Sequence, residues 1–303
     1  MNTYRRSFLL FAAWTESSGL GTSSAAWTVY DMDRAAHTFL SYYYAKMAAE
    51  PRHNAGVGVA GSLEAGICQE VSERYRRRLP GLRRARKGWS ELEPTHHHSP
   101  LPYDWMRLLS LWFACHGHRR EAMGLLVGFD GYLRVSELLG LTAADVQLPE
   151  DVRGAAVTTT RLALGRTKTC AAGDEQVAVL RDTLAQAAIE WLAENPLANG
   201  RLFDCTPARF NELIAAGCAA HRLPGVFTAH CLRHGKATFD SILGVPRSDI
   251  KERGRWACEE SLRTYIHVWT AYHVGLRAPA SAAAALADAM NDTVIAMMVF
   301  PEL

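Results

Sequence analysis

The stretch His230-Cys231-Leu232-Arg233-His234-Gly235 lies near the start of a segment with clear helix boundaries. Thr228 is suited to cap a helix that begins after it, and Gly244 is suited to end it, so the pattern predicts a helix over residues 229–243. His230 and Arg233 are three residues apart and share one face of that helix. An imidazole beside a guanidinium suits the binding of an anion, although this pair alone is unremarkable.

Three other short motifs carry side chains of related chemistry. They are Gly131-Tyr132-Leu133-Arg134-Val135-Ser136-Glu137-Leu138-Leu139-Gly140-Leu141, Gly165-Arg166-Thr167-Lys168-Thr169, and Gly254-Arg255-Trp256 followed by Leu262-Arg263-Thr264-Tyr265-Ile266-His267. Each motif alone is a weak signal, because Arg134 and Glu137, for example, are spaced like an ordinary surface pair on a helix. Their combination is more specific than any one of them.

The combined side chains suit the transfer of a phosphoryl group. A phosphodiester is negatively charged, and the guanidiniums of Arg134 and Arg233 present forks that match its oxygens. Preorganised positive groups of this kind usually supply the largest catalytic effect. Tyr265 can act as the nucleophile, because a phenol becomes reactive when cations stabilise its phenolate. Lys168 can protonate the leaving oxygen, and His230 can take the phenolic proton or donate a hydrogen bond to the phosphate.

In their order and spacing, the four motifs resemble the catalytic domain of the tyrosine recombinases, the phage-integrase-like family. The match covers roughly residues 103–269. The family's positions fall on Arg134 as the first arginine with Glu137 as its acidic companion, Lys168 as the β-hairpin lysine, His230 and Arg233 as the His-x-x-Arg box, Trp256 as the residue at the His/Trp position, and Tyr265, nine residues later, as the nucleophile.

The resemblance implies a set of roles for these residues. Arg134 and Arg233 would hold the non-bridging oxygens of the scissile phosphate, Lys168 would protonate the departing 5′ oxygen, and Tyr265 would form a 3′-phosphotyrosyl bond. Trp256 would pack against the phosphate or the tyrosine. Supporting roles are expected for Glu137 and for His234, with His234 on the other side of the helix turn from His230. The reaction conserves the energy of the phosphodiester, so no ATP, no metal ion and no other cofactor is implied.

The pattern along the chain predicts a mainly α fold with a small antiparallel β-sheet, in which a DNA breaking-rejoining catalytic core follows a short helical N-terminal domain. Residues 157–164 and 176–180 are β-branched or alternating and predict the two strands of a hairpin. A Gly/Ser-rich stretch predicts a flexible N-terminus, and the Gly-rich residues 51–61 are expected to break a helix. The expected domains are residues 1–25 as a flexible N-terminus, 26–93 as a helical, basic, core-binding-like domain, 94–102 as a linker, 103–270 as the catalytic domain, and 271–303 as a C-terminal tail or helix.

The strongest local charge lies in residues 71–90, although the net charge of the whole chain is only +2. Apart from the acid Glu73, the charged residues of this stretch are basic. They are Arg74, Arg76, Arg77, Arg78, Arg83, Arg84, Arg86 and Lys87. A cluster of this kind predicts contact with the phosphates of DNA. A solvated helix face or a localisation signal is the alternative interpretation.

The expected partner is double-stranded DNA, on which the family resemblance implies a homo-oligomer, a tetramer, held together through the C-terminal helix within residues 281–300. No apolar run reaches the roughly 18 residues of a membrane span. The seven cysteines contain no Cys-x-x-Cys pair. We therefore expect neither a membrane-spanning segment nor a metal centre. We expect an intracellular protein that is located with the DNA, which means the nucleus if the host is eukaryotic.

Three functions remain open from the sequence. The leading hypothesis is a site-specific recombinase or integrase of a mobile element, which cuts and rejoins DNA. The second is a catalytically silent DNA-binding protein derived from such an enzyme. The third is a type IB topoisomerase or a hairpin telomere resolvase, which would use the same chemistry without strand exchange.

Overall fold

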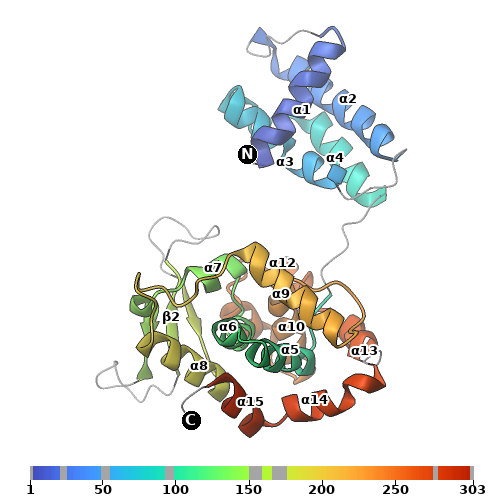
Figure 1. Ribbon diagram of the computed structural model, residues 1–303. Coiled ribbons are helices and arrows are strands. Elements are labelled where there is room, and N and C mark those ends of the chain that lie inside the picture. Colours follow the sequence, from blue (N-terminus) through green and yellow to red (C-terminus); the bar gives the residue numbers. More distant parts are fainter. Residues whose placement is uncertain are drawn as a thin grey trace. The chain divides into compact units, whose positions relative to one another are not determined.

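The computed structural model describes residues 3–20, 26–48, 55–92, 99–149, 159–165, 176–275 and 279–300. It divides into two compact units, Met1–His96 and His97–Leu303 (Figure 1). This division falls within the expected linker, residues 94–102. The observed elements are mainly helices with a small sheet, so the predicted fold class is confirmed.

The first unit is a bundle of helices around an aromatic core. Its elements are α1 (Thr3–Ser17), α2 (Val29–Ala48), α3 (Ala55–Glu70), the 3-10 turn η2 (Glu73–Tyr75) and α4 (Pro80–Leu92). The ring of Phe11 contacts Trp14, Trp27 and Phe39, with centroid separations of 5.5–6.5 Å. The carboxylate of Asp33 on α2 accepts hydrogen bonds from the first backbone N–H groups of α4, at Gly81 and Leu82. Those N–H groups have no partner inside their own helix, so Asp33 joins α2 to the start of α4.

The expectation of a flexible N-terminus was wrong for residues 3–17. Residues 3–17 form the packed helix α1 rather than part of a flexible N-terminus, because Phe8, Phe11 and Trp14 recur at helical spacing and give it an apolar face. The Gly-rich residues 51–61 were expected to break the helix before them, and α2 does end ahead of them, at Ala48, whereas α3 begins within them, at Ala55. Glycine here permits a close approach, since a Cβ at Gly66 would lie 2.4 Å from the carbonyl oxygen of Tyr4 on α1.

The second unit contains the remaining helices and the sheet. Its elements are α5 (Tyr103–Cys115), α6 (Arg119–Asp130), α7 (Val135–Gly140), η3 (Ala143–Asp145), β1 (Val146–Gln147), β2 (Arg161–Ala163), β3 (Val177–Val179), α8 (Thr183–Glu194), α9 (Pro207–Ala220), α10 (His230–Ile242), α11 (Arg247–Arg253), α12 (Glu259–Arg263), α13 (Val268–Gly275), η5 (Ala280–Ala282), α14 (Ala283–Ala289) and α15 (Asp292–Val299). Figure 1 shows α5, α6 and α10 at the centre of this unit, with the sheet and α8 at one side.

The sheet is antiparallel in the order β1-β2-β3. Leu162 of β2 lies opposite Val146 of β1 and opposite Ala178 of β3, and Leu162 and Ala178 are both buried. Strands β2 and β3 lie within the two segments predicted to form a hairpin. The sequence analysis missed β1, because two residues are too short to display an alternating pattern.

Helix α10 runs through the centre of the second unit. The backbone N–H of Leu101 donates to the carbonyl of Cys231 on this helix, over 3.2 Å. A Cβ at position 235 would lie 2.2 Å from the carbonyl oxygen of Leu101 and 2.8 Å from the ring of Phe129, so only glycine fits there. This contact fixes the depth at which the helix that carries His230 and Arg233 is inserted.

The C-terminal helices α14 and α15 pack against α5 of the same chain (Figure 1). Arg107 of α5 donates to the carbonyl of Ala289 over 2.6 Å and forms an ion pair with Asp292, also at 2.6 Å. Ile295 and Val299 are buried in the main core. Docking of residues 281–300 on a neighbouring copy stays a prediction, and within one chain these helices complete the chain's own core.

None of the helices in the described ranges is long and apolar enough by itself to cross a membrane. The only candidate there is a pair, Ala280–Ala289 with Asp292–Val299, which qualifies by length and composition alone and is bent by 80°.

The structure predicts that α1 is an integral part of the first unit. Phe11 is 1% exposed, whereas Leu9 on the same helix is 44% exposed. Phe11→Ala should lower the free energy of unfolding of this unit by about 3–5 kcal/mol, the usual cost of truncating a buried phenylalanine. Leu9→Ala, the matched control, should change it by less than about 0.5 kcal/mol. Urea unfolding of the full chain, followed by fluorescence, measures both, and equal effects would contradict the packed α1.

Candidate active site

The structure brings together side chains from four separate elements. Arg134 and Glu137 stand at the start of α7, and His230, Arg233 and His234 lie on α10. Trp256 follows α11, and Tyr265 follows α12. Lys168 lies outside the described residues. The other residues predicted to be catalytic or supporting thus lie on elements of the second unit that meet around α10.

Glu137 occupies a buried position rather than the surface position that its spacing from Arg134 first suggests. Its side chain is 7% exposed and accepts hydrogen bonds from the backbone N–H of Arg134, over 3.0 Å, and from the Arg134 guanidinium. Arg255 donates over 2.9 Å to Oε2, the oxygen that also accepts from the Arg134 backbone. Burial alone would raise the pKa of Glu137, but these hydrogen bonds and the charges of the two arginines outweigh it and hold the pKa below its usual value.

Arg233 is 1% exposed, which is exceptional for a charged side chain. Its guanidinium donates to the carbonyl of Tyr132 over 3.0 Å and to the carbonyl of Gly254. The guanidinium carbon lies 4.7 Å from the ring centroid of Trp256 and 5.7 Å from that of Tyr265. Burial, with smaller contributions from the charges of Arg255 and Arg134, lowers the pKa of Arg233 to about 10, so it remains a cation at neutral pH.

Tyr265 is held among aromatic and imidazole rings. Its ring stacks on His234 with centroids 4.2 Å apart, and it contacts Trp256 at 4.9 Å and His230 at 5.7 Å. Thr238 of α10 donates its hydroxyl to the carbonyl of Tyr265 over 3.2 Å. The tyrosine backbone is therefore fastened to the same helix that supplies the arginine and the histidines.

The expectation that His234 lies across the helix turn from His230 was wrong. The two residues are four apart, so they share a face, and their ring centroids are 5.0 Å apart. Thr238 continues this face after a further four residues. Spacing by fours along residues 230–238 was the sequence signal that could have placed His234 against the tyrosine and identified Thr238.

Trp256 closes the site by folding back over Gly254. A Cβ on Gly254 would lie 1.6 Å from the Trp256 ring, so glycine is required at this position. Among the described residues, no acceptor pairs with the buried indole Nε1 of Trp256 or with the buried Nε of Arg233. Buried donors that lack a partner are uncommon in folded proteins. Beside several guanidiniums, they suit an anionic ligand whose oxygens would complete their hydrogen bonds.

Behind the site lies a buried ionic network that the sequence analysis did not identify. Lys236 contacts Asp130 at 3.2 Å and Asp240 at 3.0 Å, and Arg253 contacts the same two carboxylates at 3.4 and 3.0 Å. The hydroxyl of Tyr132 donates to Asp240, and burial is the main cause that raises the pKa of this tyrosine. The spacing of Lys236 and Asp240 by four residues was visible in the sequence, but the two partners from other elements were not.

The basic residues of the first unit lie on and around η2 and α4. Several of them pair with acids: Arg76 with Glu73, Arg83 with Glu64, and Lys87 with Glu91, at 2.5, 2.7 and 3.7 Å. Arg74 bonds the carbonyl of Trp27 and the hydroxyl of Tyr75. Arg76, Arg77, Arg83 and Arg86 line a shallow hollow of about 390 Å³ together with Glu64. Arg78 and Arg84 are exposed. The surface remains basic, although ion pairs engage part of its charge.

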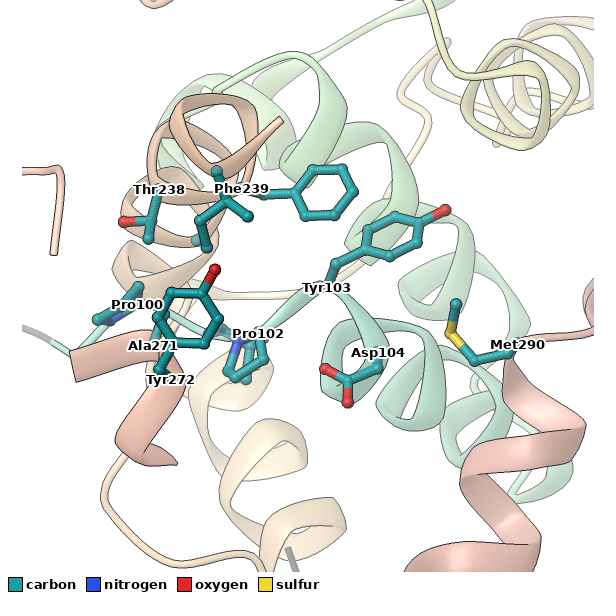
Figure 2. A pocket seen from close by; sticks show the side chains of 12 residues that line it. Pro100, Pro102, Tyr103, Asp104, Thr238, Phe239, Ala271, Tyr272 and Met290 are labelled. Carbon is teal, nitrogen blue, oxygen red and sulfur yellow. The ribbon is translucent and has the colours of Figure 1, made fainter. Parts of the chain in front are cut away.

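Helix α10 also borders an apolar groove of about 410 Å³ (Figure 2). Figure 2 shows Tyr103 and Phe239 beside each other and Tyr272 and Pro102 facing the same space. The rings of Tyr103 and Phe239 stack with centroids 4.5 Å apart. Asp104 is the charged residue among those that line the groove, and burial raises its pKa. Among the described residues that line it, the groove thus has no cation of the kind found around Tyr265.

The ionic network predicts a specific response to pH. The pKa of Asp130 lies below its usual value, because Lys236, two backbone N–H groups and Arg253 outweigh its burial. The ionised carboxylate therefore stabilises the fold above its unfolded pKa of about 4, and this stabilisation is lost as the pH falls through the lower folded value. Asp130→Asn should cost about 3–5 kcal/mol at pH 7, because it leaves buried cations without a partner.

The difference in unfolding free energy between wild type and Asp130→Asn should narrow between pH 5 and pH 2. Urea unfolding at each pH measures it. The exposed Asp249 provides the control, since Asp249→Asn removes a carboxylate outside this network. A difference that stays constant over this range would contradict the assigned stabilisation.

Comparison with known proteins gives similarity at the level of structure. No family model and no curated protein matches the sequence. The XerH site-specific recombinase, in a post-cleavage complex with a palindromic difH substrate, is 16% identical over 87% of this chain and 75% of that chain, with a TM-score of 0.53. The Tn1549 transposon integrase, in complex with circular intermediate DNA, is 14% identical over 86% of this chain and 94% of that chain, with a TM-score of 0.51. The chain thus has the fold of the tyrosine recombinases that its four motifs resemble.

Proposed function

We propose that this chain is a site-specific DNA recombinase or integrase that cuts and rejoins DNA through a 3′-phosphotyrosyl intermediate. The observation that carries the proposal is the placement of Tyr265. Its ring stacks on His234 and lies 5.7 Å from the buried guanidinium carbon of Arg233, in a site that also holds Arg134. The similar fold of the XerH recombinase and the Tn1549 integrase, both in complex with DNA, supports the same class of reaction.

The proposed first step is an in-line displacement at phosphorus. Arg134 and Arg233 bind the non-bridging oxygens, and the Tyr265 oxygen forms a bond to phosphorus as the bond to the 5′ oxygen breaks. The phenolic proton passes to His230, and Lys168 donates a proton to the departing 5′ oxygen. The indole N–H of Trp256 is a further donor for the phosphate. A 5′ hydroxyl then attacks the phosphotyrosine and restores a phosphodiester, so the reaction needs no ATP.

The first unit would contact the DNA backbone through its basic surface. Arg84 and Arg86 on α4 are exposed, as is Arg78 before it. Contacts of this kind bind DNA without regard to sequence and release counterions. The reaction pairs two duplexes, so we propose that the chain acts on DNA as a homo-oligomer, a tetramer, with the C-terminal helices contributing to contacts between copies. A protein with this activity would work in the compartment that holds its DNA.

The decisive variant is Tyr265→Phe. The wild-type chain should form a covalent adduct with nicked duplex DNA in which a short 5′-hydroxyl fragment is lost after cleavage. A pool of random duplexes serves as the probe, and adducts that survive detergent are collected and sequenced. Tyr265→Phe should abolish the adduct, because it removes the attacking oxygen. Tyr272→Phe, an exposed tyrosine on α13, is the matched control and should retain it.

Other outcomes identify the competing functions. If the Tyr265→Phe variant still formed a covalent adduct with DNA, Tyr265 would not be the nucleophile. Binding of DNA without any adduct would favour a catalytically silent DNA-binding protein. Relaxation of supercoiled DNA by a protein that never joins two duplexes would favour a type IB topoisomerase.

The DNA-contacting surface predicts a change in salt dependence. The double variant Arg84→Ala, Arg86→Ala should weaken binding to all DNA sequences alike and reduce the slope of log K against log salt by about 2, since each phosphate contact contributes about 0.9. Arg209→Ala provides the control, because Arg209 pairs with Glu212 on α9 of the other unit. Titrations at several salt concentrations measure the slope, and an unchanged slope would exclude phosphate contacts by these two arginines.

A further inference from the structure

We propose that Arg255 is a positioning residue that sets Arg134 for phosphate binding through a carboxylate that both arginines share. The proposal rests on the proposed function, because it assigns Arg134 to the phosphate. Arg255 belongs to the motif Gly254-Arg255-Trp256, in which the sequence analysis gave a role to Trp256 alone.

One carboxylate links the two guanidiniums. Arg255 donates from Nη2 to Oε2 of Glu137 over 2.9 Å, and the Arg134 guanidinium donates to Oε1. Each oxygen of Glu137 thus binds the guanidinium of a different arginine, and Oε2 also accepts from the backbone N–H of Arg134, over 3.0 Å. The side chains of Arg255 and Glu137 are both 7% exposed, whereas that of Arg134 is 29% exposed. Arg134 is therefore the accessible member, and Arg255 is the buried member that holds the shared carboxylate in place.

Arg255 also reaches the second catalytic arginine through the backbone. Its Nη1 donates to the carbonyl of Gly131, and its Nη2 donates to the carbonyl of Tyr132, both over 3.2 Å. The same Tyr132 carbonyl accepts from Arg233 over 3.0 Å. Arg255 is thus bonded to the turn between α6 and α7 that orients Arg233 and that leads directly into Arg134.

The charges give this arrangement a chemical consequence. Two guanidiniums, from Arg134 and Arg255, contact the carboxylate of Glu137, and a third, from Arg233, is close enough to interact with it electrostatically. Without Arg255, Arg134 would be the one cation left in contact with Glu137 among the described residues, and the carboxylate would offset more of the charge that Arg134 offers to a phosphate. With Arg255 in place, Glu137 divides its charge between two guanidiniums, and among the described contacts Arg134 meets it through Nη1 alone, so the rest of the accessible guanidinium faces the ligand.

The backbone at Arg255 has a conformation that glycine adopts more easily, yet the position holds an arginine whose side chain bonds the site. Its φ is 58°, in the left-handed region that glycine adopts without strain and that an arginine avoids. Tyr132, which supplies the shared carbonyl, has a φ of 52°. Strained residues that persist in a fold concentrate at functional sites. Glycine would be the unstrained choice at position 255, and it would lack the guanidinium.

The experiment compares Arg255→Gly with Arg222→Gly. Arg222 is exposed, lies at the end of α9 and has a φ of 52°, so its replacement by glycine relieves the same kind of backbone conformation outside the site. Two readouts are measured for each protein. They are the affinity for inorganic vanadate, an oxyanion that needs no DNA sequence, and the single-turnover rate and amplitude of adduct formation with saturating nicked duplex from the selected pool.

Arg255→Gly should weaken vanadate binding about tenfold or more and slow adduct formation by about 10- to 100-fold, the range found when the partner that orients a metal ligand is removed. The amplitude should stay at the wild-type level, because a mispositioned Arg134 slows every molecule, whereas partial unfolding would remove molecules from the reaction. Arg222→Gly should match wild type in both readouts. Arg255→Lys, which keeps the charge but not the fork, should lie between wild type and Arg255→Gly.

The outcomes separate this proposal from the proposed function. Vanadate binding that depends on Arg255, in a protein that forms no adduct, would retain the positioning role and reject strand cleavage. Adduct formation at the wild-type rate by Arg255→Gly would reject the positioning role and retain strand cleavage. A reduced amplitude with an unchanged rate would assign Arg255 to folding alone, and a wild-type chain that shows neither activity would overturn both proposals.

Discussion

A guanidinium that is almost completely buried constrains the second unit more than any other group. Among the described residues no carboxylate forms an ion pair with Arg233, and the carbonyls of Tyr132 and Gly254 accept its hydrogen bonds instead. A buried charge is tolerated only when such partners are supplied. Tyr132 must then hold a left-handed backbone so that its carbonyl faces the arginine, and position 254 must be glycine because Trp256 covers it. Two turns of the chain, at Tyr132 and at Gly254, are therefore shaped around one side chain.

Helix α10 has two faces that contact different parts of the second unit. The face that carries His230, His234 and Thr238 meets the segment around Tyr265. The residues Arg233, Lys236 and Asp240 recur at spacings of three and four on another face, and there they meet α6, the following turn and α11. A single helix thus orients the aromatic part of the site and anchors the charged part.

The sequence predicts the residue types of this site better than their arrangement. Arg134, Glu137, His230, Arg233, Trp256 and Tyr265 were identified from motif order, and the structure brings them together. Arg255 was quoted and not assigned, because nothing in the letters shows that its backbone is left-handed or that it shares Glu137 with Arg134. Asp130 was missed for a similar reason, since its partners Lys236 and Arg253 lie more than 100 residues away in sequence. The packed α1 was missed because a Gly/Ser-rich stretch outweighed the helical spacing of its aromatic residues.

Two charged clusters lie beside α10, and they differ in how well their charges are balanced. The balanced cluster suits a structural role, and the unbalanced cluster suits the binding of an anion. Behind the site, two carboxylates and two cations neutralise one another, and each carboxylate contacts both cations. In the site, three guanidiniums face one carboxylate, and burial lowers the pKa of both Arg233 and Arg255. Depressed pKa values mean that the fold is less stable with these cations than it would be without their charge. The cluster therefore carries more positive than negative charge, and an anion that enters the site would supply the missing counter-charge. The neutral network next to it offers the rigid support against which such an unbalanced cluster can be held.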